Sequence, residues 1–124
     1  MNIKIIINQM RCYQWVKNLL IFLPVVLSGI QISAELLLYA TIAFFSFSFV
    51  ASSVYTFNDI LDVNSDRLHF YKKNRPIASK NISIKSAYLL LFALMLLGIS
   101  LGFQVSIKFI YILVAYLFFN ILYT

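Results

Sequence analysis

Three of the four acidic residues of this chain lie within eight positions of one another. Asp59, Asp62 and Asp66 directly follow a long apolar run, and Asn58 precedes the first of them. On a helix that continues past Phe57, the three carboxylates have i, i+3 and i+7 spacing and share one face. Like charges at this spacing repel, and burial near lipid increases the cost. The sequence therefore predicts that a cationic group offsets these acids.

The chain offers two ways to supply that positive charge. In the first, the acids end a solvated helix and pair with nearby Arg67, Lys72 and Lys73. In the second, they bind Mg²⁺, which prefers oxygen ligands and commonly takes one or two carboxylates together with substrate phosphates. Asn58 adds a neutral oxygen, and the basic residues that follow can hold the phosphates. The spacing favours the metal and diphosphate interpretation.

A third interpretation is an acidic vestibule of a cation channel or transporter. Carboxylates near the membrane are common in such pathways. This interpretation accounts for the acids but leaves the adjacent basic residues without a role.

The composition is that of a membrane protein. The chain has 124 residues, of which 62% are hydrophobic and 11% are charged, and its mean hydropathy is +0.90. The net charge is +6, and six of the ten basic residues lie between 67 and 85. This cluster indicates one membrane face or an anionic ligand, and we expect no nucleic-acid partner. The single cysteine, Cys12, has no partner for an internal disulfide.

Four apolar segments are candidates to span a bilayer, which takes about 20 residues. A preceding segment has apolar residues at helical spacing with polar residues on its other side, as in a helix that lies along the membrane surface. The expected organisation is a single all-α transmembrane helix bundle, with a surface helix at about 2–14 and spans at about 18–32, 36–57, 86–107 and 109–124.

The distribution of basic residues predicts the orientation. The loop at about 64–85 carries the basic cluster, whereas the connection near 31–35 has no Lys or Arg. By the positive-inside rule, the N-terminus and the 64–85 loop both face the cytoplasm. We therefore expect a multi-pass protein of the cell membrane.

Small residues recur four apart in two of the expected spans. Gly98 and Gly102 stand in the third, and Ser48 and Ser52 in the second. Such spacing lets helices approach closely in lipid. We expect this packing to occur inside the bundle rather than between copies of the chain.

Three motifs together resemble one known family. "NDILDVNSD", at 58–66, matches the NDxxDxxxD motif of the UbiA superfamily of intramembrane prenyltransferases. "RCYQWVKN", at 11–18, is similar to the RxxQWxKN opening, and "KKNRPIAS", at 72–79, resembles the KxxRPIASG segment, of the branch that includes decaprenyl-phosphate phosphoribosyltransferase. Lys80 stands where that segment usually has Gly.

The resemblance implies a nine-helix UbiA-type bundle, of which this chain is the N-terminal portion, and Mg²⁺ as cofactor. The metal and diphosphate ligands would be Asn58, Asp59, Asp62 and Asp66, with Asp59 and Asp62 as the catalytic pair. The substrate-binding residues would be Lys17, Asn58, Lys73, Arg75 and Tyr123. The only histidine, His69, lies in a basic loop, where a solvated role is more common than a catalytic one.

The resemblance also implies the reaction. It is the Mg²⁺-dependent transfer of a phosphoribosyl group from 5-phosphoribosyl diphosphate to a polyprenyl phosphate in the lipid bilayer, with release of pyrophosphate. Family members are longer, so we expect this chain to be truncated and inactive without the missing C-terminal helices. The alternatives are a UbiA-type prenyltransferase with a polyprenyl diphosphate donor, and a non-catalytic four-helix membrane protein.

Overall fold

A computed structural model describes residues 2–27, 29 and 31–123, and within these residues it contains helices and loops but no strand. This confirms the all-α class. In chain order the elements are α1 (Ile3–Met10), the 3₁₀ helix η1 (Cys12–Phe22), α2 (Leu23–Leu27), α3 (Ala34–Leu61), α4 (Val63–Leu68), the short 3₁₀ helix η2 (Lys72–Asn74), α5 (Ile84–Val105) and α6 (Ile107–Tyr123).

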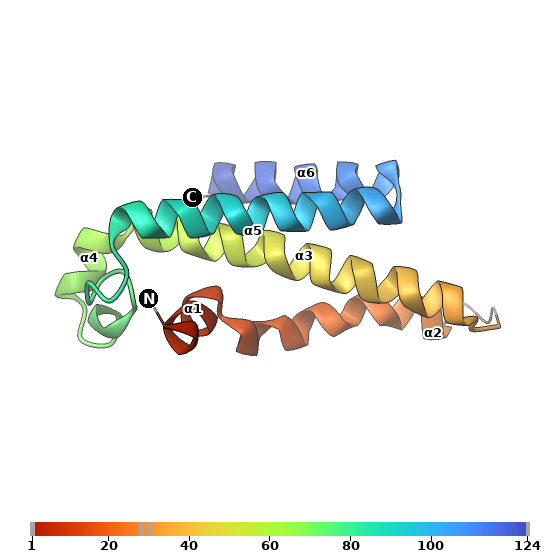
Figure 1. The fold of residues 1–124 in the computed structure, drawn as a ribbon, viewed down its shortest axis with the longest axis horizontal. Helices are drawn as coiled ribbons and strands as arrows, with labels where there is room; N and C mark the ends of the chain where they lie inside the picture. Colours follow the sequence, from red (N-terminus) through yellow and green to blue (C-terminus); the bar gives the residue numbers. More distant parts are fainter. Residues whose placement is uncertain (1, 28, 30, 124) are drawn as a thin grey trace.

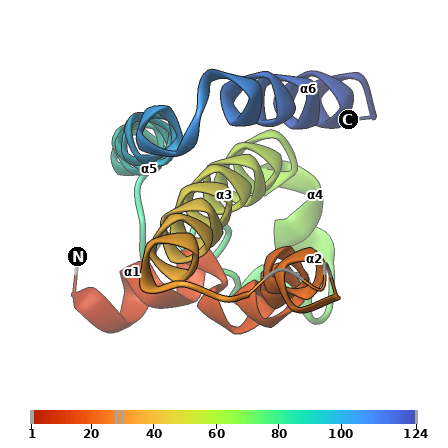
Figure 2. The same cartoon turned by 90° about the vertical axis from the view of Figure 1, so that its right-hand side faces the viewer.

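Helix α3 is the centre of the molecule. Figures 1 and 2 show it between α5 and α6 on one side and α1, η1 and α2 on the other. Ser33 precedes its first residue, and the Ser33 side chain accepts a hydrogen bond from the Leu36 N–H at 3.0 Å and so caps the helix. Small side chains are buried along its length, including Ala43, Ser46 and Ala51. They let neighbouring helices approach its backbone.

Two helices are long and apolar enough to cross a membrane. Among the described residues these are α3, with 28 residues and a hydropathy of 1.8, and α5, with 22 residues and a hydropathy of 2.1. They correspond to the second and third expected spans. The segments Cys12–Leu27 and Ile107–Tyr123 are shorter apolar helices. The four-span count and the nine-helix bundle stay predictions.

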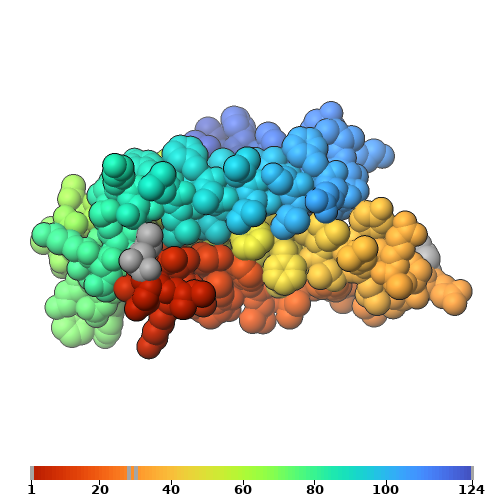
Figure 3. Space-filling view, viewed as in Figure 1, coloured from red at the N-terminus to blue at the C-terminus, as the bar shows by residue number. Residues whose placement is uncertain are grey.

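The outer surface of the bundle is apolar. Leu96, Phe103 and Phe119 are each at least 60% exposed, as suits side chains that face lipid. In Figure 3 the side chains of α5 and α6 cover the upper part of this face, and those of α1 and α3 fill the part below.

The N-terminal segment departs from the expected surface helix at 2–14. Helix α1 ends at Met10 because Arg11 adopts a left-handed conformation, with φ 55° and ψ 48°. The chain then continues as a 3₁₀ helix of 11 residues, whereas 3₁₀ runs rarely exceed three or four residues.

Hydrogen bonds to serines of α3 hold this segment in place. The Trp15 Nε1–H donates to Ser52 Oγ at 3.0 Å, and the Asn18 amide donates to Ser48 Oγ at 2.9 Å. Ser52 Oγ in turn donates to the Met10 carbonyl at 2.6 Å. The small residues Ser48 and Ser52 therefore join η1 to α3.

Glycines on α5 provide the close approach to α3 and α6. The carbonyl of Gly98 accepts a hydrogen bond from Ser46 Oγ at 2.6 Å, and a Cβ on Gly98 would lie 2.6 Å from Val50 Cγ2. A Cβ on Gly102 would lie 2.9 Å from side-chain atoms of Ile110 and Leu113. The expectation that these glycines pack inside the bundle is confirmed.

The 64–85 segment is folded rather than extended. Ile77, Ala78 and Ile82 are buried, and the two isoleucines pack with Ile60 at the end of α3. Arg67 Nε donates to the Ala78 carbonyl at 3.1 Å. These contacts fix the basic loop against the end of the bundle, where it meets α1.

The first prediction concerns Gly98. Replacement Gly98→Ala puts a methyl group against Val50 and the Ser46 backbone and should destabilise the helix pair by roughly 1 to 3 kcal/mol. We expect a lower apparent Tm for the chain in detergent, followed by circular dichroism. Ser100→Ala, at an exposed position of the same helix, is the matched control and should leave the Tm unchanged. Equal Tm values for both variants would contradict this packing.

The second prediction concerns Lys80, whose φ is 69°. Left-handed backbone costs a non-glycine residue roughly 1 to 2 kcal/mol, and glycine avoids that cost. Lys80→Gly should therefore raise the apparent Tm, whereas Lys80→Ala removes the same charge and keeps the strain. A Tm increase of the same size in both variants would assign the effect to charge instead.

Candidate functional site

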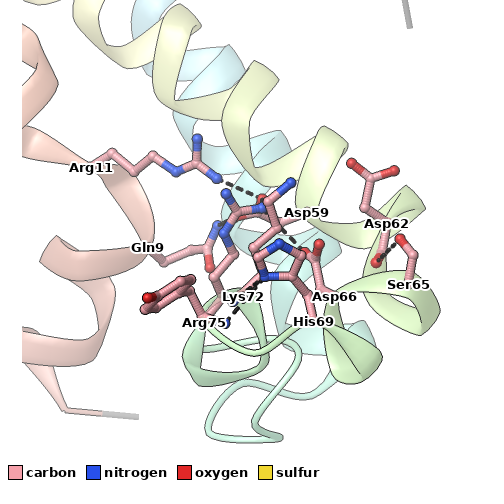
Figure 4. Close-up of polar contacts among 10 residues, drawn as sticks. Gln9, Arg11, Asp59, Asp62, Ser65, Asp66, His69, Lys72 and Arg75 are labelled. Atoms are coloured by element: carbon pink, nitrogen blue, oxygen red, sulfur yellow. Dashed lines mark hydrogen bonds and ion pairs between the residues drawn. The ribbon is translucent and has the colours of Figure 1, made fainter.

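Asp59 lies in the last turn of α3 and, among the described residues, is the carboxylate with the most hydrogen bonds. The residue is 3% exposed. Arg11 Nη2 donates to its Oδ1 at 2.6 Å and Arg75 Nη1 to the same oxygen at 3.4 Å, while Gln9 Nε2 donates to Oδ2 at 3.0 Å. Figure 4 shows these groups converging from α1, α3 and the loop before α5. Buried charge of this kind is stable only when it is paired and hydrogen-bonded.

Asp66 joins the same group through Arg75. It lies on α4, is also 3% exposed, and accepts a hydrogen bond from Arg75 Nη1 at 3.2 Å. Arg75 precedes Pro76, which restricts it to extended backbone, and its φ of −60° and ψ of 146° agree. The loop therefore delivers one guanidinium nitrogen to two carboxylates that are seven positions apart.

Arg11 is held on two sides. Its guanidinium carbon lies 5.0 Å from the centre of the Tyr55 ring, a cation–π contact, while Nη2 meets Asp59. The left-handed backbone of Arg11 ends α1 next to α3. Strained backbone of this kind persists where surrounding contacts fix it, and here the ion pair with Asp59 is such a contact.

The structure separates Asp62 from the other two acids. Helix α3 ends at Leu61, and Asp62, with φ −93° and ψ 8°, forms the junction with α4. The single continuous helical face expected for the three acids is therefore broken at its middle member. Asp62 is exposed, and Figure 4 shows its carboxylate pointing away from those of Asp59 and Asp66.

Four further expected site residues lie apart from this group. Asn58 faces a different cavity, described below. Lys17 Nζ donates to Gln14 Oε1 at 2.7 Å, and Lys73 Nζ lies 5.3 Å from the centre of the Phe70 ring. Tyr123, at the end of α6, is 94% exposed.

A polar cavity of about 300 Å³ opens beside Asp59. Its charged lining residues are Arg11, Arg75 and Asp59, and Asp66 pairs with Arg75 from outside the lining. Its neutral polar lining residues are Asn8, Gln9, Tyr13, Gln14, Tyr71 and Asn74. The cavity is suited to a hydrophilic anion.

An apolar cavity of about 220 Å³ lies on another side of α3. Helices α3, α5 and α6 line it with side chains that include Phe57, Leu91, Phe92 and Leu117. Asn58 lines this cavity, whereas the next residue, Asp59, lines the polar one. The end of α3 therefore separates two cavities of opposite character.

Metal binding depends on which carboxylates lie close to one another. Among the described residues, no three His, Cys, Asp or Glu side chains form a cluster that could hold a metal ion by themselves. Asp59 Oδ1 and Asp66 Oδ2, however, both contact Arg75 Nη1. They fit the one or two carboxylates that Mg²⁺ commonly takes when water and substrate phosphate complete its shell.

Two site residues were missed in the sequence analysis, namely Gln9 and Arg11. Arg11 opens the "RCYQWVKN" segment, so the motif itself was the available signal. Nothing in the sequence marked Gln9. A glutamine on the polar side of a surface helix gives the same sequence pattern whether its side chain is buried or exposed to solvent.

A nearby histidine has a structural role. His69 Nδ1 accepts hydrogen bonds from the N–H groups of Tyr71 and Lys72 at 3.1 and 3.2 Å. The histidine therefore orders the loop that carries Arg75.

Comparison with known proteins identifies relatives. The model of the UbiA prenyltransferase family matches residues 19–124. The uncharacterized protein y4nM of Sinorhizobium fredii is 30% identical over 95% of the chain and 23% of that protein. The nodulation protein NoeC of Azorhizobium caulinodans is 40% identical over 71% of the chain and 28% of that protein. The decaprenyl-phosphate phosphoribosyltransferase of Corynebacterium glutamicum is 37% identical over 78% of the chain and 30% of that enzyme.

The chain thus spans between 23% and 30% of the length of these three relatives. It corresponds to one portion of each of them.

The third prediction tests the pairing of Arg75 with Asp66. Arg75→Met removes the only donor that Asp66 has among the described residues, so the buried carboxylate is left unpaired. A hydrogen bond to a charged group contributes roughly 1.5 to 3 kcal/mol, and we expect a loss of that order, measured as a lower apparent Tm in detergent.

Adding Asp66→Asn removes the unpaired charge and should restore part of this loss. Lys73→Met, at an exposed neighbouring cation, is the matched control and should have little effect. A double variant less stable than Arg75→Met alone would contradict the assigned ion pair.

Proposed function

The chain belongs to the UbiA prenyltransferase family of membrane transferases, and on that premise we propose that it serves the Mg²⁺-dependent transfer of a phosphoribosyl group. The donor is 5-phosphoribosyl diphosphate, the acceptor is a membrane polyprenyl phosphate, and pyrophosphate is released. The proposal takes its substrates from the name of the related decaprenyl-phosphate phosphoribosyltransferase.

The observation that carries the proposal is the pair of unlike cavities at the end of α3. The polar cavity beside Asp59 suits a hydrophilic donor, and the apolar cavity beside Asn58 suits an isoprenoid chain. A reaction between a water-soluble phosphosugar and a lipid phosphate needs both environments side by side.

The location of positive charge supports the same assignment. The polar cavity adjoins the loop at 64–85, which carries the basic cluster and which we infer faces the cytoplasm. Arg11 and Arg75 are partly exposed, at 18% and 31% of their side chains. Both guanidinium groups can therefore turn part of their hydrogen-bonding edge toward phosphate.

We infer that Asp59 and Asp66 hold Mg²⁺ together with the donor diphosphate. When bound, the ion neutralises the charge that develops on the departing pyrophosphate. Arg75 Nη1 now contacts both carboxylates, so cation binding requires Arg75 to shift toward the phosphates. Asp62 and Asn58, which face elsewhere in this structure, would complete the set only after a local rearrangement.

The chemistry asks the protein for positioning and electrostatic stabilisation. The bond between the anomeric carbon and the pyrophosphate oxygen breaks, and a bond from that carbon to an acceptor phosphate oxygen forms. The acceptor oxygen is already anionic, so no general base is needed. Arg11 and Arg75 stabilise charge on the leaving group, and the buried setting of Asp59 strengthens these interactions.

The fourth prediction tests the reaction directly. Membranes that contain the chain, alone and within whatever longer product its gene encodes, are supplied with Mg²⁺, labelled 5-phosphoribosyl diphosphate and polyprenyl phosphate. From the longer form we expect lipid-linked phosphoribose that disappears on chelation and returns with Mg²⁺, and from the chain alone we expect no product. Asp59→Asn should lower kcat/KM by roughly 100-fold or more, because one preorganised charge is lost.

Glu35→Gln makes the same chemical change at an exposed acid at the start of α3 and should leave the rate unchanged. Transfer from a polyprenyl diphosphate instead would favour the prenyltransferase alternative. Transfer of neither group by any form would favour the non-catalytic one.

A further inference from the structure

Gln9, which lines the polar cavity, has a buried hydrogen-bond acceptor that no donor satisfies. Its side chain is 1% exposed, and it lines the cavity. Within the described part of the chain, its Oε1 is buried and has no hydrogen-bond partner. Buried polar groups are nearly always hydrogen-bonded, and an orphan calls for a specific explanation.

The orientation of this amide is fixed by Asp59. A carboxylate only accepts hydrogen bonds, so the nitrogen of the Gln9 amide must face it, as the 3.0 Å bond from Nε2 to Oδ2 shows. The oxygen of the same amide is therefore directed elsewhere for as long as Asp59 is ionised. Because Oε1 itself is buried, a donor on a molecule in the cavity reaches it only after a shift of the side chains that cover it.

The other neutral groups around the cavity have the same character. Asn8, Gln14 and Asn74 contribute amides, and Tyr13 and Tyr71 contribute phenols. Of the described residues that line the cavity, Pro76 alone has no polar group in its side chain. Such a wall offers both donors and acceptors next to two guanidinium groups.

We propose that this cavity binds the phosphorylated-sugar part of the donor, and that Gln9 Oε1 accepts a hydrogen bond from a sugar hydroxyl. The inference rests on the proposed function and deepens it by assigning what selects the donor. A sugar hydroxyl supplies the missing donor, while the phosphate meets the partly exposed guanidinium groups of Arg11 and Arg75. An isoprenoid chain can do neither, so it would leave the buried Gln9 Oε1 without a donor and the two guanidinium groups without a phosphate, which is a strong basis for rejection.

The fifth prediction compares two phosphates of equal charge. Ribose 5-phosphate and n-pentyl phosphate have the same carbon number, but only the sugar carries hydroxyl groups. Binding of each to the purified protein at its native length is measured by isothermal titration calorimetry. We expect the wild-type protein to prefer the sugar phosphate by about tenfold or more, because hydrogen-bonding sites discriminate strongly against ligands that lack the matching group.

Two variants isolate the acceptor. Gln9→Met removes both the acceptor and the hydrogen bond to Asp59, whereas Gln9→Lys keeps a donor to Asp59 and removes only the acceptor. Both should reduce the preference for the sugar phosphate several-fold, and the added charge of lysine cancels in the ratio. Gln104→Met, at an exposed position of α5, is the matched control and should keep the wild-type ratio.

The outcomes separate this inference from the proposed function. A wild-type ratio in Gln9→Lys, or equal binding of the two phosphates by the wild-type protein, would overturn the inference, and phosphoribosyl transfer by the same protein would then still support the proposed function. Absence of sugar-phosphate binding together with absence of phosphoribosyl transfer would overturn both.

Discussion

The buried carboxylate of Asp59 is the constraint on which the arrangement of this chain depends. Removing a carboxylate from water costs several kcal/mol unless cationic donors surround it. Asp59 obtains these donors from Arg11 and Arg75, which lie 48 positions before it and 16 positions after it. The N-terminal segment and the basic loop must therefore both return to the end of α3. One charge thus fixes how three distant parts of the sequence meet.

The sequence allowed the helical class and much of the central architecture to be predicted. Composition and apolar runs were sufficient for α3 and α5, because long apolar segments have few alternatives in lipid. The acid cluster was also evident. Its geometry was not, because the break at Asp62 depends on how α4 turns back toward Arg75, and the partners of Asp59 are set by tertiary contacts that no local pattern encodes.

The 3₁₀ conformation of η1 could not be predicted from the sequence, for a related reason. An apolar segment such as Cys12–Phe22 is equally compatible with an α-helix, and the choice depends on its neighbour. In a 3₁₀ helix the side chains of residues three apart are aligned, so Trp15 and Asn18 point the same way. Their partners, Ser52 and Ser48, are four apart on α3 and also share a face. Three residues of a 3₁₀ helix and four residues of an α-helix both rise about 6 Å, so the two pairs line up.

The 3₁₀ conformation also changes the reach of the N-terminal segment. A 3₁₀ helix rises about 2.0 Å per residue, against about 1.5 Å in an α-helix. The 11 residues of η1 therefore extend about 22 Å, and α2 adds about 7 Å. The apolar segment Cys12–Leu27 has too few residues for a bilayer-spanning α-helix, yet its stretched form approaches the thickness of the hydrocarbon core, about 30 Å. Winding the backbone more tightly thus lengthens an apolar segment without adding residues.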